Sequence, residues 1–415
     1  MTGLLIWASA VLCALLLLQA FWVWRFARMF RDRDTDPSFE NEWPRAVVLL
    51  SLRGADPFLP DCIRGLLNQK YPSYDVRIIV DSYSDPAWDV VQSLIEEHRG
   101  NADVSIRVIE QRFDTCGLRL SAFIQEIESL DETYDVVAYL DADVIPYENW
   151  LHDLVAPLAD PDVGATTGVR FYQPGDSNWG TLVRYLWNLA ALLQMRVFQI
   201  AWGGSLALRA SVFRESDLLK TWSRIVFEDT HTFDALRSMG LRLRIVPAVT
   251  MPNRESIPLD SCYSFIRRQM LNPKLYHSRW PLILALGLIM TTHLAILQIL
   301  VGVGAMTQNW QLASAAGGVL AAYGLGLGVA ASIQSNCMQR VVTARGEPTV
   351  AIPLKCAAAG VVVQWMYAWC LLSVLLLRQI RWRGITYDIH GPMDIRIQDY
   401  SPYTPAPETA DASII

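Results

Sequence analysis

The sequence contains few charged residues. Only 18% of its 415 residues are charged, 52% are hydrophobic, and the mean hydropathy is +0.22. This balance is too apolar for an ordinary soluble enzyme of this length, so we expect a membrane protein. The formal net charge is −6, and no basic stripe occurs outside the flanks of the hydrophobic runs. Both features argue against nucleic acid as a partner.

Cysteine is also scarce. The seven cysteines are scattered and odd in number, and no C-x-x-C pair occurs. This pattern favours reduced, structural thiols in a protein that faces the cytosol.

Four long apolar runs divide the chain. The first, residues 4–24, lacks the small-residue cleavage site of a signal peptide, so we interpret residues 1–33 as a retained transmembrane anchor. Arginines follow the run and place its end in the cytosol by the positive-inside rule: Arg25, Arg28, Arg31 and Arg33. A cytosolic domain is expected at residues 34–256. Three further spans at residues 281–303, 310–333 and 356–377 then form a membrane region, residues 281–384.

This topology contains a conflict. Three crossings after a cytosolic domain put three arginines on the outside, against the same rule: Arg378, Arg381 and Arg383. Either one apolar segment is re-entrant or the C-terminus breaks the rule. Residues 385–415 contain four prolines and are expected to form an irregular tail.

The cytosolic block alternates β-type and helical runs. Strands are predicted at residues 46–52, 76–80, 105–109 and 136–140, with helices between them, one around residues 61–69. This order indicates an α/β domain with a largely parallel sheet, in which ligands bind outside the carboxyl ends of the strands. Polar residues follow three of the strands: Ser51 and Arg53, Asp81 and Asp85, and Asp141 and Asp143.

Asp141 and Asp143 form a D-x-D pair at the end of an apolar run that reads as a buried strand. Mg²⁺ and Mn²⁺ prefer hard oxygen ligands and often use one or two carboxylates together with substrate phosphates. The pair could therefore hold a divalent cation that carries the diphosphate of a sugar nucleotide. An isolated D-x-D is more often a solvated turn, so the interpretation depends on the other motifs.

Four motifs occur in order: SLRGADP at residues 51–57, DSYSDPA at 81–87, DAD at 141–143 and FEDT at 227–230. They resemble the motifs of membrane-bound family 2 and family 21 glycosyltransferases, and they are most similar to those of ceramide glucosyltransferases. The resemblance covers residues 45–280. It implies a GT-A fold, a UDP-sugar donor, Mg²⁺ or Mn²⁺, inversion at the anomeric carbon and a lipid acceptor.

The resemblance also implies roles for individual residues. Asp85, with Asp81 nearby, corresponds to a carboxylate that binds the uracil or ribose; the alternative for Asp85 is an Asp-Pro turn. Asp143 is the expected direct metal ligand, beside Asp141. Asp229 is the expected general base, and Glu228 would set its pKa by like-charge proximity. The alternative for the Glu228–Asp229 pair is the first turn of a helix, where acidic residues are favoured.

One motif departs from the family. Processive members carry Q-x-x-R-W, whereas residues 267–271 read RRQML. Arg267 and Arg268 keep cations available for the departing diphosphate, but the later arginine and the tryptophan are absent. The departure disfavours a processive polysaccharide synthase. Arg279-Trp280 is a possible shifted substitute, although an interfacial anchor is the more ordinary interpretation.

Further regions fit the same function. Arg119 follows Gly117 where relatives often have a lysine, so we expect it to contact donor phosphate; the alternative is a solvated charge at a helix start. Trp202, Gly203, Gly204 and Ser205 resemble the acceptor-binding segment, the alternative being a loop that leads into a strand. Residues 179–202 and 257–280 are expected to be interfacial helices that position a lipid headgroup. The alternative for the first is an ordinary buried helix.

The sequence therefore predicts an inverting, metal-dependent glycosyltransferase that moves one hexose from UDP-glucose to ceramide. Its domain would face the cytosol, from the inner membrane of a bacterium or from the Golgi or ER of a eukaryote. Alternatives are another lipid acceptor or UDP-galactose on the same fold, a chain-extending synthase, and a non-catalytic membrane scaffold.

Overall fold

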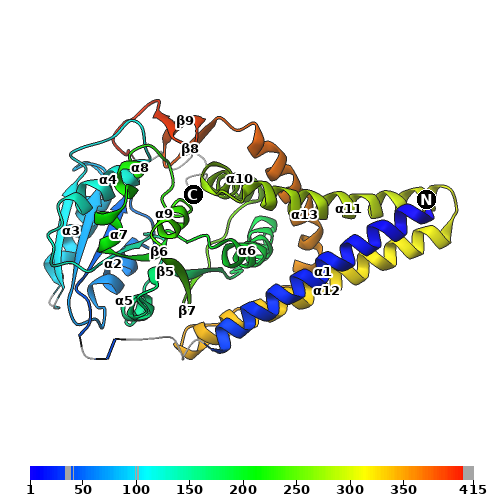
Figure 1. Cartoon of the computed structure of the whole chain (residues 1–415), viewed down its shortest axis with the longest axis horizontal. Helices are drawn as coiled ribbons and strands as arrows, with labels where there is room; N and C mark the ends of the chain where they lie inside the picture. Colours follow the sequence, from blue (N-terminus) through cyan, green and yellow to red (C-terminus); the bar gives the residue numbers. More distant parts are fainter. Residues whose placement is uncertain (33–38, 41, 99, 101, 405–415) are drawn as a thin grey trace.

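The computed structural model describes residues 1–32, 39–40, 42–98, 100 and 102–404. These residues form an α/β domain, a set of long apolar helices and a small C-terminal sheet (Figure 1). Arg33 and the predicted boundary at residue 34 lie outside the described residues.

The α/β domain is built on a mixed seven-stranded sheet with the order β3-β2-β1-β4-β6-β5-β7. Its strands are β1 (Ala46–Leu52), β2 (Tyr74–Val80), β3 (Asp103–Val108), β4 (Val136–Leu140), β5 (Val163–Tyr172), β6 (Ser205–Arg209) and β7 (Arg242–Asn253). β6 is antiparallel to both of its neighbours, and all other neighbouring strands are parallel. The predicted α/β class and its largely parallel sheet are confirmed. The carboxyl ends of β1, β2 and β4 meet at one edge.

Helices cover both faces of the sheet because successive strand side chains point to opposite sides. In β1, Val47 and Leu49 belong to one hydrophobic core, whereas Val48 and Leu50 belong to the other. The first core contains α4 (Leu118–Glu128) and α8 (Leu218–Trp222), and the second contains α2 (Leu59–Leu67), α3 (Pro86–Glu97) and α5 (Trp150–Val155). The remaining short elements are η2 (Ala156–Ala159), α7 (Ala210–Glu215) and α9 (Thr232–Ser238).

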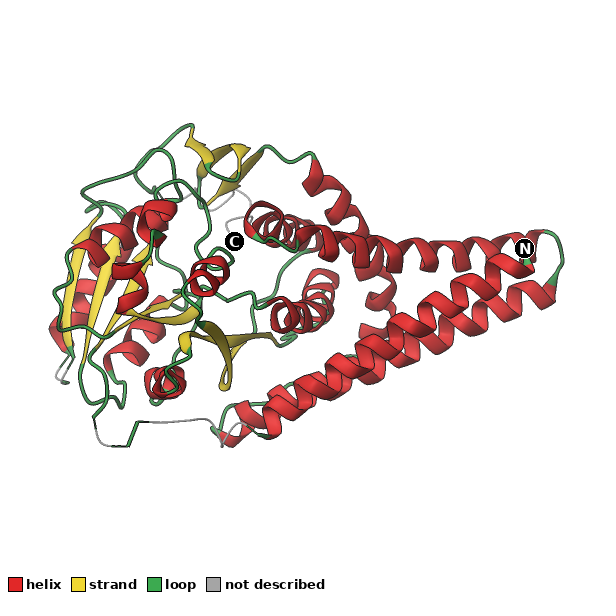
Figure 2. Cartoon of the chain, in the orientation of Figure 1, coloured by secondary structure: helices red, strands yellow, loops and turns green. Residues whose placement is uncertain are grey.

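Three apolar helices project from this domain: α1 (Thr2–Arg31), α11 (Trp280–Met306) and α12 (Trp310–Ala344) (Figure 2). They pack on one another through a shared cluster that includes Leu12, Leu297 and Tyr323. Other large apolar side chains point outward, among them Trp7, Leu17, Ile299 and Leu325. With α13 (Cys356–Leu375), the described chain has four helices long and apolar enough to cross a membrane. Such exposed apolar surface fits contact with lipid and the expected membrane protein.

Both ends of α13 contact the α/β domain and its connected helices. At its start, Lys355 Nζ donates to the carbonyl oxygen of Ser177 at 2.8 Å. At its end, the carbonyl oxygen of Leu375 accepts from Lys274 Nζ at 3.1 Å. Because α13 is a single continuous helix with both ends at these parts, it lies alongside them, which favours the re-entrant alternative, in which this segment does not cross the membrane. The three arginines in conflict with the positive-inside rule then lie on the side of the α/β domain: Arg378, Arg381 and Arg383.

The C-terminal region forms a three-stranded antiparallel sheet of β8 (Gln379–Trp382), β9 (Ile385–Gly391) and β10 (Asp394–Ile397). The prediction of an irregular tail over residues 385–415 is therefore wrong for residues 385–397. Alternate side chains of β9 are buried, namely Ile385, Tyr387 and Ile389. This period-2 pattern is typical of a strand with one buried face, and the neighbouring prolines concealed it.

α6 (Trp179–Phe198) and α10 (Leu259–Tyr276) correspond to the two predicted interfacial stretches. Most of α6 is buried, including Arg184, whose guanidinium lies 3.1 Å from the Glu255 carboxylate. In Figure 1, α6 lies between the sheet and the apolar helices. Its burial supports the alternative of a buried helix, while contact of α10 with a membrane surface stays a prediction.

Candidate active site

A pocket of about 190 Å³ lies at the carboxyl ends of β1 and β4. It brings together eleven residues that the sequence singled out: Ser51, Arg53, Arg119, Asp141, Asp143, Trp202, Gly203, Gly204, Glu228, Asp229 and Arg268. It also contains residues that the sequence did not suggest, among them Arg170, Asn272, Trp382 and Arg383. Asp81, Asp85, Ser205 and Arg267 do not line it.

Arginines hold both carboxylates of the D-x-D pair. Arg119 Nη1 lies 2.5 Å from Asp141 Oδ1, and Arg170 on β5 forms an ion pair with Asp143. Arg170 Nη1 is also 3.9 Å from Asp141 Oδ2. Arg170 is the one charged residue in an otherwise uncharged strand, which is a weak sequence signal that a buried anion lies nearby.

The chemistry of the two carboxylates fits a divalent cation. Within the described ranges, no group of three or more His, Cys, Asp or Glu side chains converges as a metal site. Asp141 and Asp143 nevertheless both line the pocket. Mg²⁺ is often bound by one or two carboxylates plus substrate phosphates, so the pair needs no further protein ligand. Burial raises the pKa of Asp143, and Arg170 opposes the shift.

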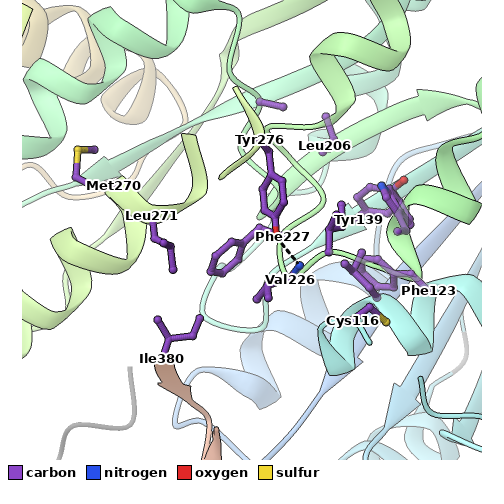
Figure 3. Packing of buried hydrophobic residues seen from close by; sticks show 14 of the residues in the cluster. Cys116, Phe123, Tyr139, Leu206, Val226, Phe227, Met270, Leu271, Tyr276 and Ile380 are labelled. Carbon is purple, nitrogen blue, oxygen red and sulfur yellow. Dashed lines mark hydrogen bonds between the residues drawn. The ribbon is translucent and has the colours of Figure 1, made fainter. Parts of the chain in front are cut away.

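The loop before α9 carries Glu228 and Asp229 and is anchored from two sides. The backbone N–H of Val226 donates to the Tyr276 hydroxyl of α10 at 3.0 Å (Figure 3). The N–H of Gly117 donates to the Ile225 carbonyl at 2.8 Å, and a Cβ on Gly117 would lie 2.5 Å from the Val226 oxygen. The acidic pair precedes α9 rather than forming its first turn, unlike the helix-start alternative.

Burial raises the pKa of both carboxyls on this loop. The pKa of Glu228 rises to about 7, because burial outweighs the opposing charge of Arg119, whose Nε lies 3.5 Å from Glu228 Oε1. Burial also raises the pKa of Asp229, against hydrogen bonds from the Asn272 carboxamide and the Thr230 N–H. A raised pKa suits a carboxyl for general-base chemistry, and the shift is in that direction for both residues.

The Trp202–Gly204 segment passes directly against the carboxylates. The Gly203 N–H lies 3.4 Å from Asp229 Oδ2, and its carbonyl accepts from Arg119 Nη2 at 2.9 Å. A Cβ on Gly204 would overlap the Asp141 carboxylate, so glycine allows this approach. Ser205 differs, because it is fully buried in β6 and its hydroxyl accepts from Trp150 Nε1 at 2.9 Å.

Asp85 is used as a helix cap. Its carboxylate accepts from the backbone N–H groups of Ala87 and Gly54, each at 2.9 Å, and the residue is buried at the start of α3. The structure therefore supports the Asp-Pro turn, the alternative to donor binding.

Asp81 lies under a segment that we call the C-terminal strap, residues 398–404. The Tyr400 hydroxyl and the Tyr403 N–H each donate to its carboxylate at 2.9 Å, and Arg53 forms an ion pair with it. The Arg112 guanidinium lies 3.6 Å from the centre of the Tyr400 ring. Asp81 is therefore near the pocket but covered.

The two adjacent arginines of α10 have different surroundings. The Arg268 guanidinium lines the pocket, 5.5 Å from the Trp382 ring centre. Burial lowers the pKa of Arg268 to about 10, and Arg170 and Arg383 add to this effect. The Arg267 guanidinium instead lies 5.4 Å from the Tyr263 ring centre. Only Arg268 is in place to contact a pocket ligand.

Comparison with solved structures finds distant similarities. A mannosyltransferase from Pyrobaculum calidifontis, PcManGT, in complex with GDP-Man and Mn²⁺, is 16% identical with a TM-score of 0.46, covering 89% of this chain and 98% of its own. Glucosyl-3-phosphoglycerate synthase from Mycobacterium tuberculosis, in complex with Mn²⁺ and UDP-Glc, is 14% identical with a TM-score of 0.37, covering 57% of this chain and 84% of its own.

Comparison of sequences is more informative. A ceramide glucosyltransferase of Pyricularia oryzae (strain 70-15) is 28% identical over 109 residues, which are 25% of this chain and 21% of that relative. The alignment thus spans about a fifth of the relative's length. The sequence profile of glycosyl transferase family 21 matches residues 4–394, nearly the whole chain. The protein therefore belongs to glycosyl transferase family 21, whose members transfer sugars.

Proposed function

We propose that this protein transfers one hexose from a UDP-sugar to the hydroxyl of a membrane lipid, with inversion at the anomeric carbon. UDP-glucose and ceramide are the preferred substrates. The observation that carries the proposal is one pocket that joins the carboxylate pair after β4 to the acidic loop before α9. The similarity to a ceramide glucosyltransferase over a quarter of the chain supports the choice of acceptor.

Asp141 and Asp143 would hold Mg²⁺ or Mn²⁺, which supplies Lewis-acid stabilisation of the donor diphosphate when bound. Arg119 and Arg170 keep these carboxylates oriented through their ion pairs. Arg268 would donate to the phosphate oxygens of the departing UDP, because a guanidinium suits that group. Ser51 and Arg53 complete the donor side of the pocket.

Asp229 would act as the general base. It accepts the proton of the acceptor hydroxyl while that oxygen bonds to the anomeric carbon and the bond to UDP breaks. A single displacement of this kind inverts the anomeric configuration. Trp202, Gly203 and Gly204 lie beside Asp229 and would form the acceptor subsite. The pair of Arg119 and Glu228 would tune the charge around the base.

A lipid acceptor fits the architecture better than a soluble one. α10 carries Arg268 into the pocket and also packs against α13, one of the four apolar helices. An acceptor held in a bilayer can therefore present its headgroup near the pocket. The arginines at the end of α1 support a cytosolic α/β domain by the positive-inside rule: Arg25, Arg28 and Arg31.

The direct test is UDP release by the detergent-purified protein with UDP-glucose and Mn²⁺, with and without ceramide. We expect ceramide-dependent release that Asp229→Asn abolishes. UDP release that does not depend on ceramide would support a transferase but argue against ceramide as the acceptor. Faster release from UDP-galactose than from UDP-glucose would identify galactose as the transferred sugar. A folded protein that releases no UDP with any sugar and lipid combination would support the non-catalytic scaffold.

A further inference from the structure

The hairpin formed by β8 and β9 reaches the pocket from the far end of the chain. Trp382 and Arg383 line the same pocket as Asp143 and Asp229. They follow the last apolar helix, so neither belongs to the four motifs that suggested the function.

The turn of this hairpin holds an arginine in an unfavourable backbone conformation. Trp382 pairs with Ile385, so the turn consists of Arg383 and Gly384, with φ values of +49° and +77°. Positive φ at both positions is typical of a type I′ turn, where asparagine, aspartate and glycine are usual. A strained residue that persists beside a candidate active site points to a functional need for its side chain.

The hairpin is also fixed against the α/β domain. The carbonyl oxygen of Arg383 accepts from Arg53 Nε at 2.7 Å, and the Tyr387 hydroxyl accepts from the Leu118 N–H at 3.3 Å. The Arg383 guanidinium makes two hydrogen bonds to Asp56, at 2.9 and 2.6 Å, yet the side chain is still 27% exposed. It is thus held at the pocket wall with room to contact a ligand.

Trp382 lies next to the acidic loop and to Arg268. Its ring centre lies 5.7 Å from that of Phe227, which directly precedes Glu228. Arg268 approaches the same tryptophan ring to 5.5 Å. An arginine and a tryptophan therefore stand next to the RRQML stretch, which has neither residue at the later Q-x-x-R-W positions.

We propose that the β8–β9 hairpin completes the active site, with Arg383 binding the donor diphosphate and Trp382 holding Arg268 toward the same group. This inference rests on the proposed function for the identity of the donor. A planar guanidinium can donate two parallel hydrogen bonds to phosphate oxygens, as Arg383 now does to Asp56. Burial and the nearby arginines lower the pKa of Arg268, and a bound diphosphate would offset that repulsion.

The test measures the affinity of the purified full-length protein for UDP and for inorganic pyrophosphate, each with Mn²⁺, by titration calorimetry. Arg383→Gln should weaken both ligands about 10- to 100-fold, because hydrogen bonds to charged groups are lost. Arg381→Gln is the matched control, since Arg381 lies on β8, is exposed and does not line the pocket. Its affinities should equal those of the wild type.

A second variant separates ligand binding from a structural role. Asp56→Asn breaks the same ion pair but leaves Arg383 in place, so it should weaken pyrophosphate less than Arg383→Gln does. Equal weakening by both variants would overturn the proposal and assign Arg383 to the ion pair alone. If Arg383→Gln lowers the unfolding midpoint, Arg383→Lys replaces it, with an intermediate loss expected because the charge remains.

The two ligands distinguish this inference from the proposed function. If the wild-type protein binds pyrophosphate but does not bind UDP, the proposed UDP-sugar donor is refuted. The role of Arg383 is then decided by the pyrophosphate affinities of the variants alone. Binding of neither ligand would overturn both proposals. Wild-type affinity in Arg383→Gln would overturn the role of the hairpin alone.

Discussion

Glu228 and Asp229 are neighbours in sequence but have different partners. Glu228 faces the Arg119 guanidinium, whereas Asp229 accepts hydrogen bonds from the Asn272 side chain and from backbone N–H groups. Hydrogen bonds to a carboxylate favour its ionised form, and burial opposes it. The pKa of Asp229 therefore depends on Asn272, which lies one position after the RRQML stretch.

We expect Asn272→Ala to move the acid limb of the pH–rate profile to higher pH. The base must be deprotonated to act, and loss of the Asn272 hydrogen bond raises the pKa of Asp229 further. Activity should therefore fall more at pH 6 than at pH 8. The measurement is kcat/KM against pH. Ser264→Ala, at an exposed position on α10, is the control, and an unshifted limb would contradict the assignment of Asp229 as the base.

Asp85→Ala should reduce stability rather than donor affinity. The substitution removes a helix cap and leaves the Gly54 N–H without its carboxylate partner, at a cost of about 1–3 kcal/mol in the free energy of unfolding. Chemical denaturation measures this cost, and Asp85→Asn should recover part of it. A higher KM for the donor at unchanged stability would instead show that Asp85 binds the nucleotide.

For single residues, the sequence identifies which residue types could form the site but not where their side chains point. The D-x-D pair and the acidic pair were found because strand ends and ordered motifs bring them to one edge of the sheet. Asp85 and Arg267 are of the expected residue types, but neither lines the pocket. Asp85 caps α3, and Arg267 lies on the face of α10 beside Tyr263. Arg170 and Arg383 were missed because no neighbour in sequence identifies their partners Asp143 and Asp56. The lone charge of Arg170 in an apolar strand was the one weak signal.

Among the elements, the C-terminal strap lies over the candidate nucleoside carboxylate. The Asp81 side chain has no exposed surface. The strap also packs on Gly54, where a Cβ would lie 2.7 Å from the Tyr403 ring. If Asp81 binds the nucleoside, a ligand reaches it only after the strap moves, so the affinity for UDP includes the cost of opening.

Tyr400→Phe should therefore tighten UDP binding about 2- to 10-fold, because it removes one hydrogen bond that holds the strap closed. The phenylalanine ring keeps the contact with Arg112. Titration of UDP into the purified variant measures the change. Weaker binding would mean that the Tyr400 hydroxyl contacts the nucleoside and that the strap is part of its site.

Elements were predictable where their periodicity was uninterrupted. β1 and β4 coincide with the predicted strands because each is an apolar run buried on both faces. The C-terminal sheet was missed because β8 and β10 are short, and each has a charged residue directly after its one buried position. Its burial depends on contacts with the α/β domain, such as that of Tyr387 with Leu118, and a local pattern does not reveal these.

For the whole molecule, the contacts of α13 predict that the C-terminal sheet and strap, up to Thr404, lie on the same side of the membrane as the α/β domain. In sealed vesicles, Thr404→Cys should react with a membrane-impermeant maleimide from the same side as Gln92→Cys in the domain. Gln308→Cys, in the turn between α11 and α12, should react from the opposite side. Labelling of Thr404→Cys together with Gln308→Cys would contradict a re-entrant α13.

The hairpin and the strap also bear on how the protein is made. Asp81 is paired with residues more than 300 positions later, and α11, α12 and α13 lie between them in the chain. During translation, the α/β domain emerges from the ribosome long before Arg383 and Tyr400. The pocket therefore stays incomplete until the apolar helices have been synthesised, so a stalled or truncated chain would lack part of the pocket wall.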